Sequence, residues 1–112
     1  MYPYIKNLNH EEVLKLSEQV DILSGQIVSK TISQNKYVSM TLFGFAKGED
    51  IGAHDSTGDA FVYVIDGTGK FIVDGKEHIV NKGEFLIMPA NKPHSVHAIE
   101  QFKMLLVVVF PV

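Results

Sequence analysis

The fold is decided by the stretch Phe61-Val-Tyr-Val-Ile-Asp-Gly-Thr-Gly-Lys-Phe-Ile-Val-Asp-Gly-Lys-Glu-His-Ile-Val-Asn-Lys-Gly-Glu-Phe-Leu-Ile-Met88. Its β-branched and aromatic runs are interrupted by glycines at positions 67, 75 and 83, eight residues apart. Asp74-Gly75 is the strongest single signal, because a tight hairpin turn needs the positive φ that glycine adopts easily. Short strands with turns at this spacing predict a β-sandwich or barrel.

The same pattern extends over most of the chain. Inside the quoted stretch, strands are predicted over residues 61–65, 71–73, 78–80 and 85–88. These strands are separated by turn signals such as Asp66-Gly67 and Lys82-Gly83. Outside the stretch, strands are predicted over 27–32, 37–45, 95–99 and 102–110. No long helix alternates with these strands, which argues against a parallel α/β sheet. We therefore predict an all-β domain over residues 26–112, preceded by an N-terminal extension, residues 1–25.

The N-terminal extension has a weaker pattern. Asn9 could cap a helix, with Glu12 three residues later as in a capping box. Val13 and Leu16 would form the apolar face of this helix, and Gly25 would end the segment. One short helix is the prediction, with extended structure around residues 20–23 as the alternative.

Composition limits the function. The chain has 112 residues, which predicts one domain, and it has no cysteine for disulfides or thiolate chemistry. The net charge is −3 without a basic patch, so nucleic acid is not expected as a partner. All ten basic residues are lysine, so no guanidinium can grip a phosphate or carboxylate with two parallel hydrogen bonds. Without a signal peptide or a bilayer-long apolar run, we expect a cytoplasmic protein that does not contact membranes.

Two segments carry histidines at informative spacing. The first runs from residue 48 to 67 and the second from 83 to 98. Together they resemble the two sequence motifs of the cupin superfamily, in positions Gly48, His54, Gly67, Gly83, Pro89 and His94. The resemblance covers roughly residues 40–110. It implies that residues 26–112 form a single cupin-type β-barrel, the double-stranded β-helix or jelly roll of small single-domain cupins.

The departures from the family motifs concern its metal ligands. Cupins bind a divalent metal through two histidines and a glutamate of the first motif and a histidine of the second. In this chain Ser56 stands at the second histidine position and Ala60 at the glutamate position, which leaves His54 and His94. Asp59 is a candidate third ligand only if a bulge turns it inward, because side chains alternate along a strand. No cofactor is certain, and a divalent metal (Zn, Ni, Fe or Mn) is expected to bind weakly.

The same residues outline a pocket. With strand alternation, the predicted pocket residues are His54, Ser56, Ala60, Val62 and His94. The leading prediction is a barrel that binds a small, mostly apolar or neutral molecule, in a sensing, sequestering or auxiliary role. Two alternatives are enzymes: a metal-dependent oxygenase or isomerase, or a catalyst that transfers protons through the two histidines. A third alternative is a structural barrel with a vestigial pocket.

The outer face of the barrel is expected to need a cover. Phe61, Tyr63 and Ile65 point outward in the alternation, although they are too apolar for open water. Residues 102–110 are apolar on both faces, as in a strand buried on both sides. A homodimer would explain both observations. The alternative is that residues 1–25 fold over this face.

Overall fold

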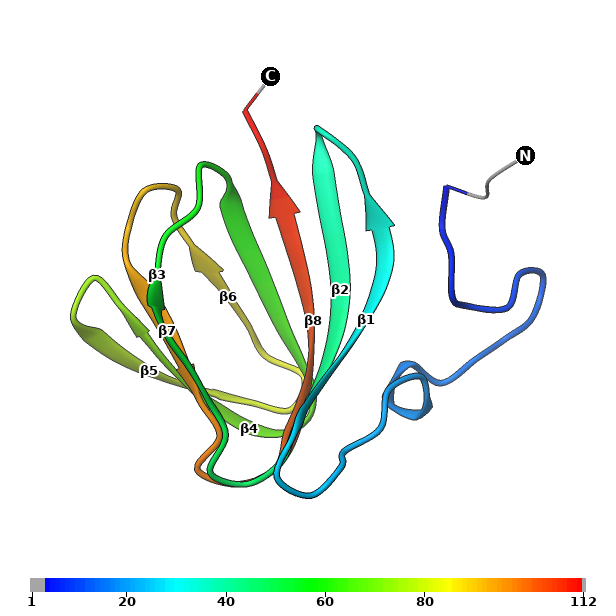
Figure 1. The fold of residues 1–112 in the computed structure, drawn as a ribbon, viewed down its shortest axis with the longest axis horizontal. Coiled ribbons are helices and arrows are strands. Elements are labelled where there is room, and N and C mark those ends of the chain that lie inside the picture. Colours follow the sequence, from blue (N-terminus) through cyan, green and yellow to red (C-terminus); the bar gives the residue numbers. More distant parts are fainter. Residues whose placement is uncertain (1–3, 112) are drawn as a thin grey trace.

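The computed structural model describes residues 4–111 and confirms the all-β prediction (Figure 1). In that range, one curled sheet contains the strands β1 (Ile27–Gln34), β2 (Val38–Phe45), β3 (Asp50–His54), β4 (Asp59–Val73), β5 (Lys76–Asn81), β6 (Phe85–Met88), β7 (His94–His97) and β8 (Phe102–Val109). Residues 4–111 contain no helix with the length and apolar character needed to cross a membrane.

The long strand β4 links two halves of the sheet. The first part of β4 pairs with β8 and β6. Together with β2 and β1, which lie beyond β8, these strands form the part that we call sheet A. The second part of β4 pairs with β5 and β7. Together with β3, which lies beyond β7, these strands form sheet B. All of these pairs are antiparallel. The curled sheet places the inner faces of the two halves opposite each other (Figure 1).

The change from one half to the other occurs at Gly67, where the sequence predicted a turn. The chain does not turn back there: β4 continues, with a register shift against β8 between Val64 and Asp66. Gly67 has a φ of 76°, and a Cβ on it would lie 2.5 Å from the carbonyl oxygen of Gln101. Only glycine combines this φ with such a close backbone approach. The glycine therefore bends a strand here and does not end it.

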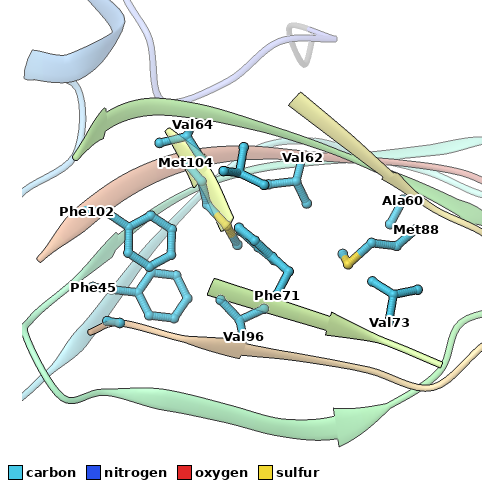
Figure 2. Packing of buried hydrophobic residues seen from close by; sticks show 12 residues of the cluster. Phe45, Ala60, Val62, Val64, Phe71, Val73, Met88, Val96, Phe102 and Met104 are labelled. Carbon is cyan, nitrogen blue, oxygen red and sulfur yellow. The ribbon is translucent and has the colours of Figure 1, made fainter. Parts of the chain in front are cut away.

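The core lies between the two sheets (Figure 2). Phe45 and Phe102 stack with their ring centroids 4.7 Å apart, and Phe71 meets Phe102 edge-on at 6.1 Å. All three rings are fully buried, and each contributes on the order of 1.5–3 kcal/mol through burial. The figure shows Phe45 and Phe102 at one end of the core and Ala60 and Met88 at the other. The aromatic rings fill their end, so space remains where the side chains are smaller.

The predicted helix from Asn9 is wrong. Glu11 has a φ of 58°, in the left-handed region, so residues 9–12 cannot form the first turn of an α-helix. The only helical element in residues 4–111 is the short 3₁₀ helix η1 (Leu16–Glu18). The alternative, a strand around residues 20–23, is also absent from this part of the chain.

The N-terminal segment covers part of the outer face of sheet A. Val20 is 4% exposed and packs in one cluster with Leu42 and Ile65. The Lys103 ammonium donates to the Ser17 carbonyl at 2.6 Å, which ties the segment to β8. In Figure 1 the segment lies outside the barrel, beside β1. The alternative to a homodimer was that residues 1–25 fold over the outer face. This alternative holds for the part of the face that the described N-terminal residues contact.

We expect Gly67→Ala to destabilise the protein more than Gly75→Ala, its matched control. Both glycines have positive φ, 76° and 82°, so both substitutions cost about 1–2 kcal/mol in backbone strain. A Cβ at residue 75 meets nothing within 4 Å, whereas one at residue 67 overlaps backbone atoms. The total loss at Gly67 is therefore about 3 kcal/mol or more. Urea unfolding of the two variants measures the difference in their free energies of unfolding. Equal losses would contradict the requirement for glycine at the bend of β4.

Candidate functional site

His54 and His94 meet because β3 and β7 are antiparallel neighbours. His54 ends β3, His94 begins β7, and the two residues are direct partners in the pairing. Their ring centroids lie 4.3 Å apart with the planes at 66°. His94 is buried at 5% exposure, whereas His54 is exposed. The pair therefore stands with one ring inside the barrel and the other toward solvent.

The backbone sets the tautomer of both rings. His54 Nδ1 lies 2.9 Å from the Gly52 carbonyl oxygen, and His94 Nδ1 lies 3.2 Å from that of Lys92. A carbonyl oxygen only accepts, so each Nδ1 carries the hydrogen and donates it. In neutral rings, each Nε2 is then an unprotonated acceptor. Within residues 4–111, no hydrogen bond reaches either Nε2, and no side-chain nitrogen or oxygen is both buried and unpartnered. The Nε2 atom of the buried His94 is therefore accessible.

The surroundings of His94 favour its neutral form. Burial lowers the pKa of His94 below its ordinary value of 6.5, because desolvation penalises the charged ring. The His54 imidazole also lowers this pKa, while the hydrogen bond to the Lys92 carbonyl and the Asp55 carboxylate raise it. The lowering causes prevail. At neutral pH the inner ring is therefore an uncharged acceptor.

A hydrogen-bond chain on the opposite face of β7 holds β3 in place. His97 Nδ1 lies 3.1 Å from the Asp50 carboxylate of β3, and its Nε2 lies 2.9 Å from Ser95 Oγ. Residues 95 and 97 point away from the barrel interior because residues 94 and 96 point into it. This chain positions the strand that carries His54, and His97 itself does not reach the cavity.

A cavity of about 130 Å³ lies next to the two histidines. Its polar lining consists of His54, Ser56 and His94. The hydroxyl oxygen of Ser56 accepts from the Gly58 N–H at 3.1 Å, so its own hydrogen is available to a guest molecule. No lysine, aspartate or glutamate of the described chain lines the space. The apolar lining residues are Phe43, Ile51, Ala60, Met88, Val96, Met104, Leu106 and Val108.

The structure places four of the five predicted pocket residues on the cavity wall. These are His54, Ser56, Ala60 and His94. Val62 does not line the cavity: it is fully buried in the core cluster, beyond Ala60 along β4.

The lining residues that the sequence did not predict lie on β2, β3, β6, β7 and β8. From β8, Met104, Leu106 and Val108 contribute every second residue, the spacing of one strand face. Alternation alone could have grouped these three. Choosing their face as the inner one needed the pairing with β4, in which Val62 faces Leu106. Ile51 was missed because the whole strand β3 was missed, since Gly52 in its middle and Asp50 at its start give a weak strand signal.

Asp59 is not placed to act as a third metal ligand. The pairing of β4 with β8 is regular from Asp59 to Val64, so no bulge at Gly58 turns the side chain inward. Asp59 is exposed, and its carboxylate accepts from the Ala90 N–H at 2.8 Å. Over residues 4–111 no group of three or more His, Cys, Asp or Glu side chains is suited to hold a metal ion. Two neutral imidazoles do not provide the three or more ligands usual for zinc or non-haem iron. The donor set does not fit the metal that the fold family implies.

The comparisons with known proteins establish the family. The cupin domain family matches residues 41–110, and the chain belongs to it. No curated protein matches the chain with significant similarity.

Solved structures agree with this assignment. A conserved protein of unknown function from Streptococcus pyogenes is 40% identical, with a TM-score of 0.96 over 99% of this chain and 97% of that one. A cupin superfamily protein from Desulfitobacterium hafniense is 27% identical, with a TM-score of 0.91 over 96% and 98%. A cupin 2 conserved barrel domain protein from Leptotrichia buccalis is 48% identical, with a TM-score of 0.84 over 86% of this chain and 47% of that one.

We expect Ser56→His with Ala60→Glu to create a metal site. Both positions line the cavity beside the two histidines, so the variant presents three imidazoles and a carboxylate. Affinity for zinc or nickel should rise by orders of magnitude over the natural protein, as measured by metal titration. A further His94→Ala should undo the gain. Stoichiometric metal that stays on the natural protein through dialysis against a chelator would contradict the depleted site.

Proposed function

We propose that this protein binds a small, mostly apolar, uncharged molecule in the barrel cavity. The observation that carries the proposal is the lining: eight apolar side chains enclose the space, and its polar end holds two imidazoles and a hydroxyl. Burying a charged guest there would be costly, because no opposite charge among the described lining residues would pair with it. We propose a sensing, sequestering or auxiliary role for this binding.

The size of the cavity limits the guest to about one ring. An apolar cavity of roughly 150 Å³ in another protein takes up benzene. The cavity here is about 130 Å³. Most of the binding free energy of such a guest comes from removing apolar surface from water, on the order of 25 cal/mol per Å². We therefore propose guests with a single ring or a chain of similar volume.

Benzene is the probe that tests this function, and the methionines report where it binds. Met88 and Met104 line the cavity, whereas Met40 packs on the outer face of sheet A. On addition of benzene, the methyl NMR signals of Met88 and Met104 should shift while that of Met40 stays unchanged. Absence of any shift at saturating benzene would contradict the proposal.

A matched pair of variants controls for binding elsewhere. Ala60→Leu fills the cavity and should abolish the benzene response. Ala53→Leu adds the same atoms at an exposed position that is not part of the lining, and it should respond like the natural protein.

We also propose that the protein forms a homodimer through the part of sheet A that the N-terminal segment leaves open. We call this part the outer strip: Phe61, Phe85, Ile87, Val107 and Val109. Phe61 and Phe85 stack with centroids 4.9 Å apart. Phe85, Ile87 and Val109 are 59%, 45% and 57% exposed. A contiguous apolar strip of this kind is typical of an interaction surface.

The length of one relative favours a second copy as the partner. In the Leptotrichia buccalis protein the matched part takes up 47% of the chain. The rest of that chain is therefore about as long as this whole protein. Two copies of this chain would bury the outer strip of each against the other, as in an isologous dimer.

The cytoplasmic location expected from the sequence stays a prediction.

Sedimentation at micromolar concentration should give twice the chain mass of 12.5 kDa. Ile87→Lys places a charge in the outer strip and should give monomers. Ile99→Lys is its control, because Ile99 is similarly exposed at 58% but lies just before β8, at the opposite end of that strand from Val107 and Val109. A monomeric natural protein, or equal effects of the two substitutions, would contradict this interface.

A further inference from the structure

The polar end of the cavity offers hydrogen-bond acceptors in an unusual arrangement. Each neutral imidazole donates its single N–H to a backbone carbonyl, His54 to that of Gly52 and His94 to that of Lys92. Each neutral ring therefore presents only an unprotonated Nε2 to a guest. Both residues line the cavity, and their ring centroids lie 4.3 Å apart.

The remaining polar group of the cavity complements these acceptors. Ser56 Oγ already accepts from the Gly58 N–H, and its hydrogen can be donated into the cavity. A hydroxyl group fits this set, since it donates one hydrogen to an imidazole and accepts one from a neighbouring hydroxyl. A carbonyl or ether oxygen would leave both Nε2 atoms without a hydrogen, and a carboxylate would face no cation among the described lining residues.

We infer that the cavity selects a small apolar molecule with a hydroxyl head, that is, an alcohol or a phenol of about one ring. This inference rests on the proposed function, since it specifies the guest of the same cavity. The apolar body lies among side chains such as Met88 and Ala60, which Figure 2 shows at one end of the core. The hydroxyl lies at the polar end of the cavity, next to His94 and Ser56. A guest without a donor leaves the acceptor of the buried His94 desolvated and unpaired, which weakens its binding.

Phenol and fluorobenzene provide the test, because they share ring and shape while only phenol donates a hydrogen bond. We expect phenol to bind the natural protein at least about threefold more tightly, from the net contribution of one hydrogen bond. Titrations followed through the Met88 and Met104 methyl signals give both dissociation constants. Equal affinities, or tighter binding of fluorobenzene, overturn the inference while the proposed function stands. If neither compound nor benzene binds, both are overturned.

Two variants locate the selectivity. His54→Phe with His94→Phe keeps two rings in place and removes both acceptors, so the preference for phenol should disappear while fluorobenzene still binds. His78→Phe makes the same change on β5, outside the cavity, and should keep the preference. A preference for phenol that survives in the double variant overturns the assignment of the acceptors. Should the double variant fail to fold, the comparison of the two compounds on the natural protein still decides.

Discussion

The bend of β4 at Gly67 is the constraint on which the other parts of the structure depend. The first half of the strand pairs with β8 and carries Ala60 to the cavity wall. The second half pairs with β7, where Val73 lies opposite His94. One continuous strand therefore links the apolar wall to the buried imidazole. Since a residue with a Cβ would collide with the backbone of Gln101, the geometry of the cavity depends on this glycine.

The chemistry of the cavity depends on the residues that stand where cupins have metal ligands. With Ser56 and Ala60 in those places, the first motif contributes one imidazole and no carboxylate. The backbone carbonyls of Gly52 and Lys92 hold the two remaining histidines in one tautomer, as carbonyls also do for metal-bound histidines. In the proposed complex, the ring nitrogens of these histidines accept a hydrogen bond from the guest. The arrangement that orients metal ligands in a cupin here suits an uncharged guest.

The sequence predicted the fold and the polar end of the site better than the walls of the cavity. His54 and His94 could be found because their spacing from glycines and a proline follows a family pattern. Met104 and Leu106 could not be assigned to the interior, because the apolar run of β8 has no polar face to orient it. The Asp66-Gly67 pair predicts a turn, because local sequence does not distinguish a turn from a bulged, bending strand. The helix from Asn9 failed because the cap pattern does not reveal the positive φ of Glu11.

Nitrogen NMR of the histidine rings tests most directly whether His54 and His94 present Nε2 as a hydrogen-bond acceptor. Long-range proton–nitrogen correlations at neutral pH report which ring nitrogen carries hydrogen. We predict the Nδ1–H form for both His54 and His94, with the Nε2 resonances shifting when phenol is added. An Nε2–H tautomer, or a doubly protonated His94 at neutral pH, would contradict the account, since the cavity would then present donors.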